Sequence, residues 1–166
     1  MAQVKDTSTI SRDLPVESTA SPKFQFSHFV APTDFSPNSE KAVDYAVQLA
    51  RRLGAKLTLL HVVPEPSAHD YAMEGISRQE IEEWEVEAEK KLAQELARAQ
   101  AEYANVESSR VTALHPRDQI VRAATDLSAD LLVISTHGYR GWKHLLFGRD
   151  AEKIVEQAPC PVVVVR

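Results

Sequence analysis

Apolar and polar residues follow two different spacings along the chain, and these spacings predict most of its secondary structure. Short segments with strand-like composition indicate strands at 24–30, 56–63, 106–114, 130–136 and 162–165, of which 130–136 is a continuous apolar run. Apolar residues at helical spacing predict helices at 37–53, 77–103, 118–127 and 148–157. Strand and helix therefore alternate along the chain.

The boundaries of the first predicted helix are marked by residues with a local structural role. We expect Pro32 to end the pairing of the first strand, Ser36 to cap the helix and Pro37 to occupy its first turn. Gly54 is expected to stop it. Its expected buried face consists of the apolar residues at helical spacing: Ala42, Tyr45, Ala46, Leu49, Ala50 and Leu53.

The helix predicted at 77–103 has an apolar stripe and an acidic face. The stripe consists of Ile81, Trp84, Ala88, Leu92, Leu96 and Ala99. The acidic face consists of Glu82, Glu83, Glu85, Glu87 and Glu89, and we expect it to face solvent.

This alternation predicts an α/β fold, a single open, doubly wound, five-stranded parallel sheet with helices on both faces. Ligands bind such sheets beyond the carboxyl ends of the strands, where the strand order reverses. The candidate residues are therefore those that follow each strand: 32–36, 61–64, His115 and 135–148.

Length and composition favour one domain. The chain has 166 residues, of which 43% are apolar. Residues 1–23 are rich in Ser, Thr and charged residues and show neither helical nor strand periodicity. We therefore expect a disordered N-terminal tail followed by one domain at 24–166.

Charge and cysteine content exclude several classes of function. The net charge of -5 argues against nucleic acid as a partner. No apolar run approaches the roughly 20 residues that span a membrane, and the first residues lack the apolar core of a signal peptide. Cys160 is the single cysteine, which excludes an intrachain disulfide and a multi-cysteine zinc site. We expect a cytoplasmic protein that neither enters a membrane nor binds nucleic acid.

The strongest local signal is a glycine-rich segment at 134–152, between a predicted buried strand and a predicted helix. Gly138, Gly141 and Gly148 would let backbone N–H groups approach an anion, next to the partial positive charge of a helix start. The alternative is that these glycines only permit turns. The spacing is neither that of a P-loop nor that of a Rossmann fingerprint.

Several motifs, in the right order and at the right intervals, resemble those of universal stress proteins. They lie at 30–36 (Val-Ala-Pro-Thr-Asp-Phe-Ser), 59–63 (Leu-Leu-His-Val-Val), 135–138 (Ser-Thr-His-Gly), 145–148 (Leu-Leu-Phe-Gly) and 158–165 (Ala-Pro-Cys-Pro-Val-Val-Val-Val). The resemblance runs from about Phe26 to Arg166. It implies the adenine nucleotide alpha-hydrolase-like version of the fold, in a family whose members divide into those that bind ATP and those that do not.

In the ATP-binding branch the glycine-rich segment reads Gly-x2-Gly-x9-Gly-Ser/Thr. Ser135, Gly138, Gly148 and Arg149 occupy that register here. Ser135 in place of the first glycine is a mild departure, because a small polar residue still leaves room. Arg149 replaces the hydroxyl residue and is the serious departure.

By the same resemblance, Arg149, Asp150 and Ala151 stand where the phosphates are received. A carboxylate about 5 Å from a phosphate charge costs about 3 kcal/mol at an effective dielectric of about 20. Asp150 aimed inward would oppose binding, unless Arg149 or a divalent cation neutralises it. Asp150 aimed outward would complement the helix dipole, and Arg149 could replace the lost hydroxyl with a charged contact to phosphate.

The resemblance also assigns the remaining candidate positions. Asp34 matches an acidic residue near adenine and ribose, and Pro32 shapes the turn that carries it. Asp34 could instead only organise this turn through its own backbone. Val62 matches an apolar residue beside the adenine, and Ile134 and His137 match positions around the sugar and phosphates.

Other chemistries have weaker support. Three histidines, His61, His115 and His137, follow strands, but no acidic pattern supports a metal site. Ser36, His137 and Asp34 lack the nucleophile elbow of a hydrolase. We therefore expect no catalytic residues and no tightly bound metal. Cys160, between two prolines, suits a buried structural position.

The sequence as a whole favours a nucleotide-binding regulatory protein of the stress response that binds ATP, with or without Mg²⁺, and turns it over slowly at most. The alternative is a dimeric interaction module of the same family that does not bind nucleotide, and a third possibility is a small-molecule enzyme. A homodimer is expected through the last strand, because the β-branched run 162–165 should not remain open to water. The sequence names no protein partner.

Overall fold

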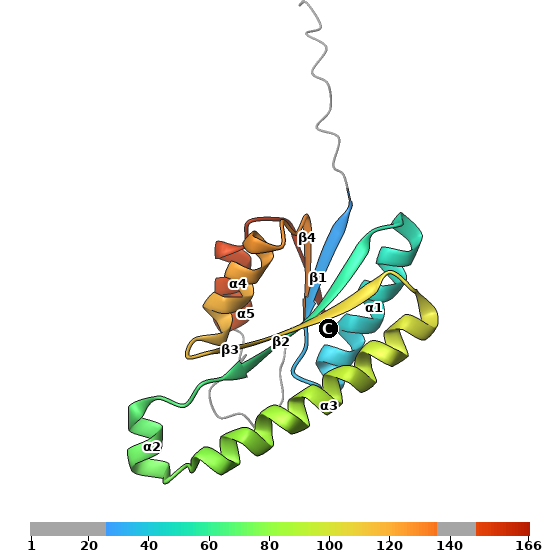
Figure 1. Cartoon of the computed structure of the whole chain (residues 1–166). Helices are drawn as coiled ribbons and strands as arrows, with labels where there is room; N and C mark the ends of the chain where they lie inside the picture. Colours follow the sequence, from blue (N-terminus) through green and yellow to red (C-terminus); the bar gives the residue numbers. More distant parts are fainter. Residues whose placement is uncertain (1–25, 136–148) are drawn as a thin grey trace, which may run out of the picture.

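Five strands and five helices make up the part of the chain that the computed structural model describes, residues 26–135 and 149–166 (Figure 1). The strands are β1 (His28–Pro32), β2 (Lys56–Pro64), β3 (Val106–Ala113), β4 (Leu131–Ser135) and β5 (Val162–Val165). The helices are α1 (Pro37–Leu53), α2 (Ala68–Glu74), α3 (Arg78–Glu102), α4 (Pro116–Asp126) and α5 (Arg149–Gln157). Every predicted strand and helix is present.

The five strands form one parallel sheet in the order β3-β2-β1-β4-β5. The chain builds outward from β1 to β3, then crosses to the other side of β1 and builds outward again. The order therefore reverses between β1 and β4. The predicted doubly wound parallel sheet is confirmed.

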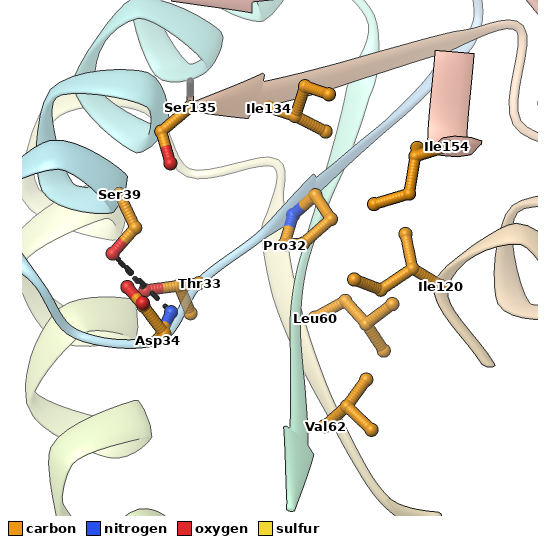
Figure 2. Close-up of a pocket in the computed structure, with 10 residues that line it drawn as sticks. All are labelled: Pro32, Thr33, Asp34, Ser39, Leu60, Val62, Ile120, Ile134, Ser135 and Ile154. Carbon is orange, nitrogen blue, oxygen red and sulfur yellow. Dashed lines mark hydrogen bonds between the residues drawn. The ribbon is translucent and has the colours of Figure 1, made fainter. Parts of the chain in front are cut away.

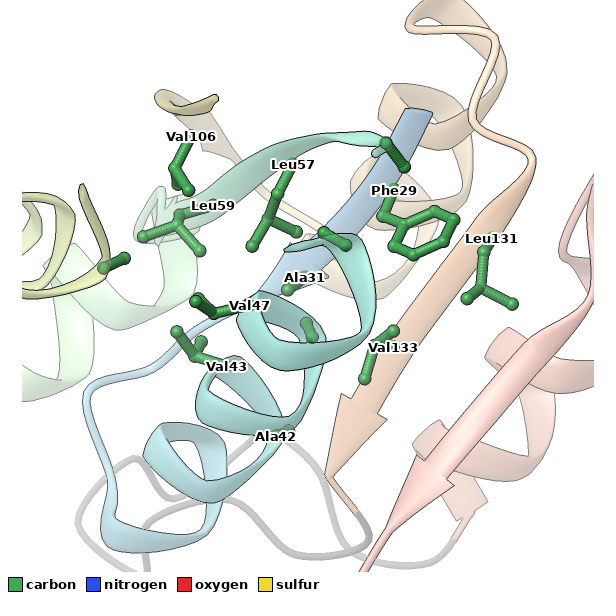
Figure 3. Close-up of a cluster of buried hydrophobic side chains, with 14 of the residues drawn as sticks. Phe29, Ala31, Ala42, Val43, Val47, Leu57, Leu59, Val106, Leu131 and Val133 are labelled. Carbon is green, nitrogen blue, oxygen red and sulfur yellow. The ribbon is translucent and has the colours of Figure 1, made fainter. Parts of the chain in front are cut away.

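Helices cover both faces of the sheet. Helices α1 and α3 pack on one face, and α4 and α5 lie together on the other (Figure 1). Each face has its own buried apolar cluster, one around Phe29 and Leu59, the other around Leu60 and Leu132. Figure 3 shows the first cluster between α1 and the sheet. Each fully buried Phe, Leu or Ile side chain contributes about 1.5 to 3 kcal/mol relative to an exposed one.

The predicted signals at the helix ends act as expected. Ser36 caps α1 by accepting a hydrogen bond from the backbone N–H of Ser39, and Pro37 is the first helical residue. Gly54 ends α1 in the left-handed conformation, at φ 70°. At the start of α3, Ser77 and Glu80 form a reciprocal capping box.

The buried face of α1 differs from the predicted one. Tyr45 and Leu53 are about half exposed, whereas Val43 and Val47 are buried. The prediction took the stripe to run toward Tyr45, but the sheet contacts the neighbouring stripe, in which small and β-branched side chains allow close packing. Pro32 is the last residue of β1 and pairs with Leu60, so the strand ends at this residue as expected.

Helix α3 has buried residues only from Ala88 onward. Ala88, Leu92 and Ala99 are buried as predicted, but Trp84 is 40% exposed. Figure 1 shows the reason, because the first turns of α3 extend past the sheet together with α2. Helix α2 was not predicted, since its seven residues are too few to show a helical period.

No helix within the described residues is long and apolar enough to cross a membrane. The tail predicted at 1–23 lies outside the described residues.

Candidate functional site

The turn between β1 and α1 is held by its own side chains. The Thr33 hydroxyl accepts a hydrogen bond from the backbone N–H of Phe35 at 3.1 Å. Oδ1 of Asp34 accepts one from the backbone N–H of Ser36 at 3.0 Å. Ser39 extends this network, because its hydroxyl donates to the Ser36 carbonyl at 3.0 Å. The Asp34 carboxylate therefore organises its own turn, which is one of the two roles that the sequence suggested for it.

Phe35 adopts a backbone conformation that L-residues rarely use. Its φ is 61°, in the left-handed region. Such a conformation costs about 1 to 2 kcal/mol for a residue with a side chain. It persists only where the surroundings supply compensating contacts. The turn that carries Asp34 is thus a constrained structure rather than a loose loop.

An open pocket lies at the carboxyl ends of the central strands. Figure 2 shows its lining, drawn from β1, β2, β4 and three helices. The lining residues are Pro32, Thr33, Asp34, Ser39, Leu60, Val62, Ile120, Ile134, Ser135 and Ile154. The pocket brings together five of the candidate residues predicted from the sequence: Pro32, Asp34, Val62, Ile134 and Ser135.

The two sides of the pocket differ in chemistry. Branched aliphatic side chains form one side, and Thr33, Asp34, Ser39 and Ser135 form the other (Figure 2). The lining chemistry suits a ligand with a flat apolar part and adjoining hydroxyl groups, because the aliphatic side would contact the flat part and the carboxylate of Asp34 would accept from the hydroxyls.

The position of the pocket follows from the strand order. Pro32 ends β1 and Ser135 ends β4, and these two strands flank the point where the order reverses. The described helix after β1, α1, and the described helix after β4, α5, lie on opposite faces of the sheet, an arrangement that opens a crevice between the two strand ends. The expected location of the ligand site and the observed pocket therefore coincide.

The expected phosphate-binding end is described only in part. His137, Gly138 and Gly148 lie outside the described residues. Arg149 and Asp150 are the first two residues of α5, and Ala151 follows them. The N–H groups of a first helical turn lack partners within the helix and carry a partial positive charge. The backbone at 149–151 therefore has the character that an anion requires.

His61 is buried near the carboxyl end of β2 and contacts the turn between β1 and α1. Its Nδ1 lies 2.8 Å from the Thr33 carbonyl oxygen. Burial lowers the pKa of His61, although the Thr33 carbonyl and Asp34 oppose this shift. No group of three or more metal-ligating side chains occurs in the two described ranges.

Glu95 of α3 is buried behind the same turn. Its exposed fraction is 7%, and neither carboxyl oxygen has a hydrogen-bond partner within the described residues. Burial raises the pKa of Glu95, against the opposing effects of the Thr33 hydroxyl and the Arg98 guanidinium. The sequence did not reveal this residue, because an isolated Glu on an apolar stripe is easily read as part of a solvated face.

Cys160 is half-buried beside the apolar cluster of the α4 and α5 face. Burial, followed by the charge of Asp130, raises the pKa of its thiol. The reactive thiolate is thereby disfavoured, which suits the structural position expected for Cys160.

Four lining residues were outside the candidate positions predicted from the sequence: Ser39, Leu60, Ile120 and Ile154. Leu60 had a usable signal, because residues two apart on a strand share a face and Leu60 precedes Val62 by two. Ile120 and Ile154 belong to helical stripes, whose distance from the strand ends only the folded chain shows.

Comparison with known proteins places these features in context. The sequence model described as the universal stress protein family matches residues 25–166. Universal stress protein YxiE of Bacillus subtilis is 28% identical over 155 residues, which cover 85% of this chain and 99% of that protein. Universal stress protein A homolog 1 of Coxiella burnetii is 31% identical, over 84% of this chain and 96% of that protein.

Solved structures show the same fold. Universal stress protein UspA from Lactobacillus plantarum superposes with a TM-score of 0.72 at 24% identity, covering 86% of this chain and 99% of that one. A universal stress protein in complex with cAMP has a TM-score of 0.62 at 25% identity, covering 86% and 98%. The universal stress protein from Archaeoglobus fulgidus in complex with dAMP has a TM-score of 0.63 at 23% identity, covering 86% and 99%.

Proposed function

This chain belongs to the universal stress protein family, and from that premise we propose that it binds an adenine nucleotide and acts in the cytoplasm as a regulatory protein of the stress response. The observation that carries the proposal is the pocket at the strand reversal, with an aliphatic side and a carboxylate opposite it. Two structurally similar family members were solved with the adenine nucleotides cAMP and dAMP.

In the proposed complex, the adenine lies against the aliphatic side of the pocket, near Val62. The ribose hydroxyls donate to Asp34, whose turn is already ordered by the bond to Ser36. The phosphates reach the first turn of α5, where Arg149 supplies a positive charge. ATP is the proposed ligand, with or without Mg²⁺, and Ile134, Ser135, His137, Gly138 and Gly148 complete the proposed site.

The proposed role is regulatory rather than enzymatic. Among the described residues, the histidine next to the pocket turn is His61, whose Nδ1 bonds the Thr33 carbonyl. A general base must instead reach a proton of the substrate or of an attacking water. Any ATP turnover is therefore expected to be slow.

The alternative is a dimeric interaction module that does not bind nucleotide. The observation that favours it is Asp150, which is the second residue of α5. An acidic side chain turned toward the phosphates would repel them.

Isothermal titration with ATP, ADP, AMP and cAMP, each with and without Mg²⁺, tests the proposal. We expect micromolar binding of at least one of these nucleotides. Asp34→Asn should weaken it about tenfold to hundredfold, the usual worth of a charged hydrogen bond. Asp44→Asn is the matched control, because Asp44 pairs with Arg98 on the outer side of α1 and does not line the pocket.

Absence of binding for all four nucleotides, together with no nucleotide released when the purified protein is denatured, would contradict the proposal. That result would favour the interaction module. Equal affinity of wild type and Asp34→Asn would show that the nucleotide binds elsewhere.

A further inference from the structure

We propose that His61 is a positioning residue for nucleotide binding: it holds the turn that carries Asp34 in the conformation that the ligand meets. This inference rests on the proposed function and deepens it, because it assigns a role to a residue that does not line the pocket.

The His61 side chain connects the end of β2 to the backbone of the turn. Its exposed fraction is 5%. Nδ1 lies 2.8 Å from the carbonyl oxygen of Thr33, and because a carbonyl can only accept, Nδ1 must carry the proton. The backbone N–H of Thr33 in turn donates to the carbonyl oxygen of Leu60 at 2.8 Å. Both backbone polar groups of Thr33 are thus bound to β2.

The same imidazole ring supports the strained residue of the turn. The rings of Phe35 and His61 have centroids 4.3 Å apart and planes inclined by 32°. Phe35 is the residue of the turn with a left-handed backbone, at φ 61°. The contact with His61 is therefore one of those that keep an unfavourable backbone conformation in place.

Asp34 lies between the two residues that His61 contacts. Thr33 is fixed through its carbonyl and Phe35 through its ring. A shift of either neighbour would move the Asp34 carboxylate, because the turn allows little independent motion of the residue between them. His61 therefore acts on the ligand through Asp34 rather than by contact.

The electrostatic surroundings favour the neutral imidazole that this role requires. Burial is the main cause of the lowered pKa of His61, and the positive charges of Arg110 and Lys91 add to it. The Thr33 carbonyl and the Asp34 carboxylate act in the opposite direction. A neutral ring with its proton on Nδ1 makes both contacts with the turn.

Three substitutions of His61 separate its two contacts. His61→Phe keeps a ring beside Phe35 but removes the donor. His61→Asn places an amide N–H at about the same distance from the backbone as Nδ1, whereas the longer side chain of His61→Gln displaces it. Thr58→Val is the matched control, since Thr58 is equally buried on β2 but bonds His28 and Glu107.

We expect His61→Phe and His61→Gln to weaken ATP binding about tenfold, and His61→Asn to bind within about threefold of wild type. Thr58→Val should lower the melting temperature and leave the affinity unchanged. In protein that already carries Asp34→Asn, adding His61→Phe should weaken ATP binding by less than about a further twofold, because the group that His61 positions has already been altered.

A readout without ligand tests the hold of His61 on the turn separately from the proposed function. Hydrogen exchange of the Phe35 and Ser36 amides, which donate within the turn, should be at least about tenfold faster in His61→Phe than in wild type and unchanged in Thr58→Val. If wild type binds no adenine nucleotide, the proposed function fails, and the role of His61 in nucleotide binding fails with it; faster exchange would then support only its hold on the turn.

If wild type binds nucleotide but His61→Phe shows wild-type affinity and exchange, the role of His61 is wrong and the proposed function stands. If His61→Phe does not fold, the comparison of His61→Asn with His61→Gln decides. Wild-type affinity in both His61→Asn and His61→Gln would overturn the inference. An equal loss of ATP affinity in Thr58→Val would also overturn it, because the effect would then reflect general stability.

Discussion

The carboxyl group of Glu95 lies 3.7 Å from Nη2 of Arg98, whereas Nη1 of the same guanidinium lies 2.8 Å from Asp44. Arg98 therefore gives its close contact to the half-exposed carboxylate and leaves the buried one without a hydrogen bond. A buried ionisable group without good partners reduces stability, because it loses its hydration and recovers little in return.

We expect Glu95→Gln to raise the free energy of unfolding at about pH 7 by about 1 to 3 kcal/mol, because it removes the charge while keeping the size of the side chain. Urea unfolding monitored by circular dichroism measures the change. Glu89→Gln, on the exposed face of the same helix, should change stability by less than about 0.5 kcal/mol. A less stable Glu95→Gln protein would show that the carboxylate has a stabilising contact.

The stability gained by Glu95→Gln should be larger at neutral than at acidic pH. Since burial raises the pKa of Glu95, the folded protein holds this proton more tightly than the unfolded chain. The stability that the proton provides is complete below the unfolded pKa, about 4.3, and is lost as the pH rises through the folded one. The advantage of Glu95→Gln should therefore be complete above the folded pKa, shrink as the pH falls through it, and be lost below about 4. A gain independent of pH would contradict this explanation.

Arg149 distinguishes the two leading functional hypotheses. If its guanidinium contacts phosphate, Arg149→Ala should weaken ATP binding by about 1.5 to 3 kcal/mol and AMP binding by less. Arg122→Ala is the control, because Arg122 lies exposed on α4 and pairs with Asp126. Titration calorimetry measures each affinity.

The opposite hypothesis predicts the opposite sign. If Arg149 and Asp150 block the site, the double variant Arg149→Ser, Asp150→Val should create or strengthen ATP binding. We expect the first result, because Pro32, Asp34 and Val62, which the binding hypothesis assigns to the site, line one pocket at the strand ends. Equal affinity in wild type and both variants would make Arg149 a surface residue without a role.

The last strand should join two copies of the chain. Within the described sheet, β5 is an edge strand that pairs only with β4, and Val164 is 42% exposed there. An open β-branched edge favours association. We expect wild type to sediment as a dimer at micromolar concentration and Val164→Lys to raise the dissociation constant at least about tenfold. Val155→Lys, on the exposed side of α5, should remain dimeric. A monomeric wild type would refute the proposed dimer.

Removal of residues 1–23 should leave the fold intact. The described contacts begin with Phe26, whose ring packs edge to face on Phe29, and with Ser27, whose backbone N–H donates to Asp130. We expect the melting temperature of the truncated protein to change by less than about 2 °C, because few contacts should be lost. A decrease of several degrees would show that the first residues stabilise the domain.

The local pattern of the sequence determined the elements and the class of the fold. The bounds of each predicted strand differ from the observed ones by at most a few residues, and Ser36 and Gly54 mark the ends of α1 as expected. These features depend on side-chain periodicity and on the intrinsic conformational preferences of a few residues, both of which are local. The alternation of strand and helix then implied a parallel sheet and placed the candidate site at its carboxyl edge.

Only the tertiary structure decided which segments meet. The pairing of β1 with β4 joins residues about a hundred positions apart, and no local pattern encodes it. That pairing places the pocket between Pro32 and Ser135, and the sheet selects the buried stripe of α1 on which Val43 lies and Tyr45 does not. The contact of His61 with the turn and the burial of Glu95 also depend on which segments pack together. Burial and partners are properties of packing between distant segments, so the same residue types remain ambiguous until the chain is folded.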